Sequence, residues 1–220
     1  KVFLDRREDQ YRSRADAYNA ALSAYAFALL AADGDQAAMT TLKSEVLRLR
    51  SSQTPSGGWD YEQGASGNAA ITSWNAKVLA LAEKRGIGEA ALPLRKALRW
   101  LRDAVGDGNA VCYRQGGAIG SECLAALTAH ALLTAGSKYG NLTELGRYLV
   151  MRLDPNAAET ADAYRSYAKI IAFDAAGEGA RAAVARKSMA SCSGDDVWGK
   201  VGGRLYGASL RKLVLAGNHR

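Results

Sequence analysis

The sequence contains few residues of the types that cross-link a chain or carry common catalytic chemistry. It has three cysteines and two histidines among 220 residues. Three cysteines do not form a disulfide framework and allow one bridge at most. Because His130 and His219 are the only histidines, and His219 lies next to the C-terminus, we expect no Ser–His–Asp site. The sequence also contains no glycine-rich phosphate loop and no nucleophile elbow.

Long apolar runs are also absent. No apolar stretch is long enough to cross a bilayer, so we expect a chain that does not span a membrane. The composition, with 48% hydrophobic and 23% charged residues, is typical of a globular domain. The chain begins at Lys1 without a signal-peptide pattern, so we expect that it is processed or belongs to a longer protein.

The charge is unbalanced, with a formal net charge of +7. A basic balance favours anionic partners, so an anionic surface is a candidate partner. The basic residues are nevertheless scattered over predicted helix faces, as between residues 95 and 102, and no recognition motif accompanies them. We therefore expect no specific nucleic-acid binding, and solvated outer faces explain most of these charges.

Helical periodicity is what the sequence has in abundance. Residues 16–32 are rich in Ala and Leu and apolar almost all round, which is typical of a buried helix. In residues 89–104, Leu94, Leu98 and Leu101 form one apolar stripe while the arginines point away. No convincing alternation with a period of two is present, so the sequence predicts an all-α fold.

The helices recur as a repeat. Five segments each have a polar or aromatic opening, an Ala/Leu-rich helix and a closing glycine. Their openings lie at Tyr18, Thr72, Ser121, Tyr164 and Tyr206. More amphipathic helices are predicted between them, near 38–51, 89–104, 141–153 and 179–191. The sequence therefore predicts about four to five helical hairpins that stack to cover one another's apolar faces, in a single domain over residues 15–217. Residues 1–14 are highly charged and are predicted to form an arm or linker.

One connection carries a family resemblance. The stretch "LRSSQTPSGGW" places Gln53, Gly57 and Trp59 at the spacing of the Gln-Trp repeat of triterpene cyclases, which it resembles. The sequence that follows it is similar to the broader prenyltransferase and squalene-oxidase repeat, and weaker echoes reach Gly217. The resemblance implies an α/α-toroid, or an open arc of one, in which inner helices surround a cavity and outer helices surround them. Pro55 ends a helix in this connection, and Gly57 and Gly58 allow a tight reversal.

The resemblance also suggests which residues hold the seams between hairpins or line a ligand site. Large aromatic side chains, with the glutamine of the repeat, are the candidates because they offer flat packing surfaces. They are Gln53, Trp59, Tyr61, Trp74, Tyr113 and Trp198.

The catalytic motifs of the enzymes that the sequence resembles are incomplete here. Triterpene cyclases protonate an alkene with an Asp-x-Asp-Asp motif, of which only Asp195 and Asp196 are present. Protein prenyltransferases hold zinc with an Asp-x-Cys pair, and the corresponding positions are Asn68 and Ala70. Cys123 and His130 lie seven residues apart on one helical face and are better explained as buried core residues. We therefore expect no metal and no cofactor.

A reactive thioester is a further candidate. The thioester domains of complement and macroglobulin proteins are α/α-toroids that join a cysteine to a glutamine three residues later. Cys112 and Gln115 have this spacing, but Tyr113 and Arg114 replace the small and acidic residues of the family motif. We expect no thioester at this position.

The leading hypothesis is therefore a non-catalytic toroid domain that binds a protein partner or an apolar ligand in its cavity. Similar repeats occur in bacterial multidomain and cell-envelope proteins, which implies a larger assembly at the cell envelope. The alternative is an isoprenoid-type cyclase or transferase acting in the central cavity, with Glu122 or Asp162 as its acid. A second alternative is a thioester-domain-like module of the macroglobulin type.

Overall fold

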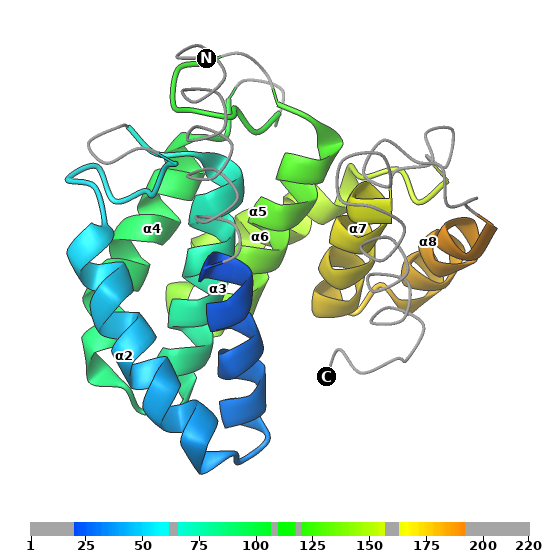
Figure 1. The fold of residues 1–220 in the computed structure, drawn as a ribbon. Helices are drawn as coiled ribbons and strands as arrows, with labels where there is room; N and C mark the ends of the chain where they lie inside the picture. Colours follow the sequence, from blue (N-terminus) through cyan, green and yellow to red (C-terminus); the bar gives the residue numbers. More distant parts are fainter. Residues whose placement is uncertain (1–19, 62–65, 107–109, 118–119, 157–162, 192–220) are drawn as a thin grey trace, which may run out of the picture. The chain divides into compact units, whose positions relative to one another are not determined.

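The computed structural model describes residues 20–61, 66–106, 110–117, 120–156 and 163–191 (Figure 1). Within these ranges every regular element is helical, and the one departure is an isolated β-bridge between Val105 and Val111. The predicted all-α class is thus confirmed for the described part of the chain. The predictions for residues 1–14 and for the repeat openings at Tyr18 and Tyr206 lie outside it.

The described helices follow the predicted repeat closely. Each Ala/Leu-rich helix is followed by a second helix after a short connection. In order they are a helix at residues 20–32, α2 (Gln36–Ser52), α3 (Ala69–Lys84), η1 (Gly88–Ala90), α4 (Ala91–Asp103), α5 (Glu122–Ala135), η3 (Ser137–Tyr139), α6 (Asn141–Met151), α7 (Ala163–Ala176) and α8 (Gly179–Ser191). The helices expected near 38–51, 89–104, 141–153 and 179–191 are therefore α2, η1 with α4, α6 and α8.

The chain divides into two compact units, residues 1–119 and 120–220, and each is described by itself. In the first unit, α3 packs against α4 and α2. In the second unit, α5 packs against α6 and α7, and α7 packs against α8. The single ring or arc that the sequence suggests stays a prediction.

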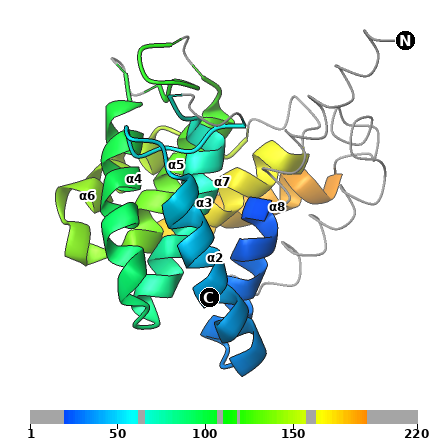
Figure 2. The same cartoon turned by 60° about the vertical axis from the view of Figure 1, so that its left-hand side comes forward.

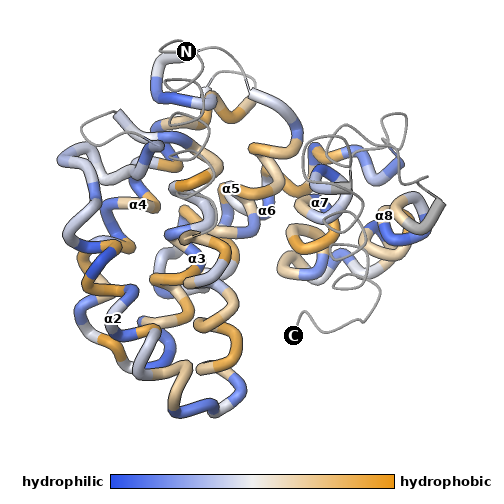
Figure 3. The backbone as a smooth tube through the Cα atoms, in the orientation of Figure 1, coloured by the Kyte–Doolittle hydropathy of each residue, from blue (hydrophilic) through white to orange (hydrophobic). Residues whose placement is uncertain are grey.

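The core of the first unit forms around α3, which lies between α2 and α4 (Figure 2). Thirteen of the 16 residues of α3 are buried, whereas α2 buries only one face. The buried residues of α2 are Ala38, Leu42, Val46 and Leu49, which recur every three or four residues. The hydropathy of the backbone shows the same contrast, with polar residues along much of α2 (Figure 3). The distribution of apolar residues thus makes α3 the inner helix and α2 an outer one.

In the second unit, α5 is the most deeply buried helix and α6 covers it closely. A Cβ on Gly146 of α6 would lie 3.1 Å from the side chains of Leu132 and Leu133 and 3.2 Å from the carbonyl oxygen of Ala129. These distances are tighter than ordinary contacts, so glycine allows the two helices to approach each other.

Side-chain caps and glycines mark the helix ends. The Asp35 carboxylate accepts the N–H of Ala38 at 3.0 Å at the start of α2, and Asn68 caps α3 in the same way. The repeat-closing glycines Gly34, Gly86 and Gly136 have φ values of 100°, 80° and 82°. The predicted role of these glycines in ending the helices is confirmed, because a positive φ is strained for other residues. Among the described residues, every helix is too short or too polar to cross a lipid bilayer.

Candidate functional site

The connection that resembles the Gln-Trp repeat joins two hairpins. The side-chain amide of Gln53 donates to the carbonyl oxygen of Gly57 at 2.8 Å and to that of Pro93 in α4 at 2.9 Å. Gln53 therefore closes the turn after α2 and ties it to the second hairpin.

Trp59 lies in the same connection and is 4% exposed. Its indole N–H donates to the carbonyl oxygen of Leu49 at 3.0 Å, which satisfies a carbonyl group in the last turn of α2. Its backbone N–H donates to the hydroxyl of Thr72 at 3.0 Å, in the first turn of α3. The side chain and backbone of Trp59 thus hold the end of α2 to the start of α3, and all its polar groups are used within the fold.

A second indole lies behind this turn. The N–H of Trp100 donates to the carbonyl oxygen of Ser66 at 2.8 Å. A Cβ on Gly58 or Gly67 would lie 2.9 Å or 2.8 Å from the Trp100 ring, so both glycines are needed for the backbone to pass over it. Sequence reasoning did not assign Trp100 to this turn, although four glycines within eleven residues are a signal of close backbone approach.

Tyr61 and Tyr113, two of the candidate residues, are brought together by the fold. Their hydroxyl oxygens lie 3.1 Å apart. Beside them, the Arg114 guanidinium lies 3.1 Å from the carboxylate of Asp60, whose side chain is fully buried. The connection after α2 and the loop before α5 are therefore joined at two points within the first unit.

Trp74 lies inside the first unit against the helix at residues 20–32. Its ring contacts Tyr25 edge to face, with the ring centroids 5.3 Å apart. The ammonium of Lys77, which is fully buried, lies 3.3 Å from the centroid of the Trp74 ring and 5.2 Å from that of Tyr25. Burial raises the pKa of Tyr25 to about 12. Trp74 is thus part of a packed aromatic and cationic cluster, and Trp198, the last candidate, lies outside the described residues.

The residues proposed for thioester and acid chemistry make fold-stabilising contacts. The amide of Gln115 donates to the carbonyl oxygen of Trp100 at 3.1 Å, and the backbone N–H of Cys112 donates to that of Ala104 at 2.8 Å. These bonds hold the loop before α5 against the end of α4. Asp162 and the Asp195–Asp196 pair lie outside the described residues.

Glu122, the other candidate acid, begins α5. Its carboxylate lies 2.7 Å from the ammonium of Lys169 in α7 and also accepts the backbone N–H of Asp154 at 2.8 Å. The same ammonium donates to the carbonyl oxygen of Asp154 at 2.8 Å, and Lys169 is 3% exposed. This closed network joins α5, α7 and the chain after α6. The sequence did not predict the role of Lys169, because its partner Glu122 lies far from it along the chain.

Arg181 of α8 performs a comparable role in the second unit. Its guanidinium donates to the carbonyl oxygens of Val150 and Leu153 and lies 4.6 Å from the centroid of the Phe173 ring. The last turn of α6 is therefore capped by a side chain from α8.

The positions that the sequence analysis compared with the zinc site of protein prenyltransferases, and the Cys123–His130 pair, lie in or next to helices. Asn68 accepts the N–H groups of Ala70 and Ile71 at 2.9 Å and 3.3 Å as the N-cap of α3. Cys123 and His130 are buried in α5. Within the described ranges, no three side chains of the His, Cys, Asp and Glu types come close enough together to hold a metal ion.

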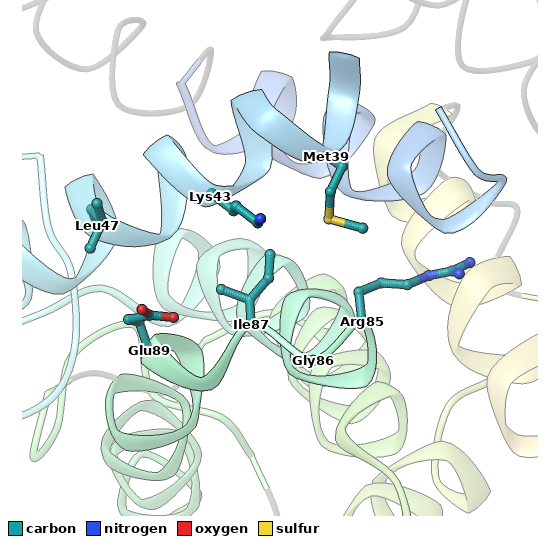
Figure 4. A pocket seen from close by; sticks show the side chains of 7 residues that line it. All are labelled: Met39, Lys43, Leu47, Arg85, Gly86, Ile87 and Glu89. Carbon is teal, nitrogen blue, oxygen red and sulfur yellow. The ribbon is translucent and has the colours of Figure 1, made fainter. Parts of the chain in front are cut away.

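The candidate binding site is a surface pocket that the sequence did not reveal. It has a volume of about 520 Å³ and lies between α2 and the connection from α3 to η1 (Figure 4). Its lining residues are Met39, Lys43, Leu47, Arg85, Gly86, Ile87 and Glu89. They combine an apolar surface with two cations and one carboxylate.

Comparisons with known proteins do not identify the chain. No protein-family model, no curated protein and no solved structure matches it. The resemblance to the toroid enzymes therefore rests on the sequence motifs alone, and function has to be argued from the geometry.

Proposed function

We propose that the chain is a non-catalytic domain of helical hairpins that binds a protein partner. The observation that supports this most strongly is the Glu122–Lys169 pair. A cavity acid must present a transferable proton to the substrate, whereas both oxygens of Glu122 face donors of the protein itself. The residue best placed for isoprenoid chemistry thus stabilises the fold instead.

The other motif residues support the same conclusion. Asn68 caps a helix, Gln115 holds a loop, and Gln53 and Trp59 join two hairpins. A repeat that keeps its packing residues and uses its reactive positions for structure is typical of a binding scaffold, because stacked hairpins present extended surfaces. We propose the α/α-toroid or open arc as its architecture and a bacterial cell-envelope assembly as its setting.

Selection from a displayed library of random peptides tests this function on the full chain. We expect families of related sequences that bind the folded protein with dissociation constants of about 10 µM or tighter. Protein unfolded in urea is the control and should enrich none of them. The absence of any enriched family would contradict the proposal, and so would turnover of farnesyl diphosphate that Glu122→Gln abolishes.

A further inference from the structure

We infer that the pocket between α2 and the α3–η1 connection is the docking groove for an acidic peptide segment of the partner, with an apolar side chain among its carboxylates. This inference rests on the proposed partner-binding function and names the surface at which the partner binds. The groove is defined by the seven lining residues Met39, Lys43, Leu47, Arg85, Gly86, Ile87 and Glu89.

One wall of the groove is a stripe along α2. Met39, Lys43 and Leu47 are spaced four residues apart, so they form one stripe along the helix, beside its buried face and on the side turned to Ile87 (Figure 4). Leu47 is 55% exposed and lines the same pocket as Met39 and Lys43. Leu47 therefore adds to the apolar lining that Met39 and Ile87 give the same pocket, and concave surfaces with apolar lining are typical of binding sites.

The opposite wall comes from the end of α3 and the start of η1. Ile87 projects toward α2 and is 5% exposed, so it forms the apolar floor between Met39 and Lys43 (Figure 4). The backbone at this point is fixed, because the N–H of Ile87 donates to the carbonyl oxygen of Ala82 at 3.0 Å. A preformed floor lowers the entropic cost of ordering the site when a ligand binds.

The charges of the lining residues favour an acidic ligand. Neither Lys43 nor Arg85 uses its side chain in an ion pair or hydrogen bond within the part of the chain that the structure describes. Glu89 is the single carboxylate among the lining residues and lies near Leu47, away from Arg85 (Figure 4). Carboxylates on a ligand would pair with Lys43 and Arg85, and its apolar side chain would cover Ile87 and Met39.

The shape of the groove favours a peptide over an enclosed small molecule. Small-molecule sites bury most of the ligand surface, whereas Lys43, Leu47 and Glu89 line this groove and are exposed. A segment of a longer chain can enter at one end of such a groove and leave at the other. Leu47 lies eight positions after Met39 in α2, which gives the wall a length of about 12 Å at 1.5 Å per residue. Three to four extended residues span this length.

The test measures the fluorescence anisotropy of a labelled peptide with the sequence Gly-Glu-Leu-Asp-Leu-Glu-Gly, added to the full chain. We expect saturable binding that weakens as salt is raised, and no binding of the matched Lys-for-acid peptide. Lys43→Ala/Arg85→Ala should weaken binding by about tenfold or more, because two charge-assisted contacts are lost. Leu47→Ser should weaken it severalfold through the apolar contact.

Arg99→Ala/Arg147→Ala provides the matched control, because it removes two exposed cations that do not line the groove. Its affinity should stay within about twofold of the unchanged protein. The charge reversal Lys43→Glu/Arg85→Glu should abolish binding of the acidic peptide and create binding of the basic one. Circular dichroism melts check that all variants are folded. We expect them to be, because substitutions of exposed residues usually change stability little.

Each outcome separates this inference from the proposed function. Peptides from the library that bind the protein but are unaffected by Lys43→Glu/Arg85→Glu would overturn the groove and leave the partner-binding function standing. If neither the acidic peptide nor any library peptide binds, both the groove inference and the partner-binding function are overturned. Binding to anionic phosphatidylglycerol vesicles, lost in Lys43→Glu/Arg85→Glu while the acidic peptide does not bind, would overturn the peptide as the occupant of the groove.

Discussion

The ammonium of Lys169 lies 2.7 Å from the carboxylate of Glu122 and donates to the carbonyl oxygen of Asp154, so one buried side chain joins three segments of the second unit. A buried charge is stable only when its partners are present, because removing one of them leaves the other without compensation in a medium of low polarity.

Removal of one member of this pair should therefore be costly. We expect Glu122→Ala to lower the free energy of unfolding by about 3 kcal/mol, since it leaves the Lys169 ammonium buried without its carboxylate. Glu122→Gln/Lys169→Met should restore part of this loss. Urea unfolding followed by circular dichroism measures both variants, and a double variant less stable than Glu122→Ala would contradict the interpretation.

Trp59 should stabilise the join between the first two hairpins. We expect Trp59→Ala to lower the free energy of unfolding by about 3–5 kcal/mol, because it opens a cavity and removes the hydrogen bond from the indole to the Leu49 carbonyl group. Trp59→Phe keeps most of the packing and loses the hydrogen bond, so it should cost about 1 kcal/mol.

Thermal melts measure these changes, and Tyr148→Ala serves as a control because Tyr148 is 43% exposed. An unchanged melt for Trp59→Ala would refute the structural role and favour a Trp59 that contacts a ligand.

The close packing of α6 against α5 predicts the effect of adding a single methyl group at Gly146. We expect Gly146→Ala to destabilise the second unit by about 1–3 kcal/mol, since its Cβ would crowd Leu132, Leu133 and the backbone of Ala129. Gly179→Ala is the matched control, because nothing lies within 4 Å of a Cβ placed there. Chemical denaturation of the two variants gives the comparison, and equal midpoints would contradict the packing.

Tyr25 gives a prediction about pH. Burial raises its pKa to about 12 from the ordinary value of 10.0, so the neutral phenol is the form that the folded chain favours. The stability due to this group is present below pH 10 and is lost as the pH rises from about 10 to about 12. The stability of Tyr25→Phe should therefore fall less than that of the unchanged protein as the pH rises over this range. Denaturation midpoints at each pH measure this difference. An identical pH profile in Tyr25→Phe would show that other groups cause the loss.

Much of the fold follows from local patterns. The apolar stripe of α4, the caps at Asp35 and Asn68 and the closing glycine Gly86 each leave a mark within one or two helical turns of sequence. Such marks fix where helices begin and end and which face they bury. The helical hairpins could therefore be predicted, with α2 and α8 close to their expected bounds.

The candidate site could not be predicted in the same way. Lys43 lies on an outer helix whose charges are typical of a solvated face, and only the fold brings it beside Ile87. Glu122 likewise begins an inner helix, where an acid suggests catalysis, until the packing of α7 places Lys169 against it. Contacts between segments far apart in the sequence depend on tertiary packing, which periodicity does not record.

The contact of Arg181 with the end of α6 has a consequence for how the protein is made. A ribosome delivers α6 about thirty residues before Arg181, so the carbonyl groups of Val150 and Leu153 first meet water and not the guanidinium. Until then the end of α6 is held by its own helical tendency and by the packing of α6 against α5, without the side-chain cap. The nascent second unit thus acquires a firm boundary late, when α8 emerges, and a chain that stalls before Arg181 leaves that end of α6 open to proteases.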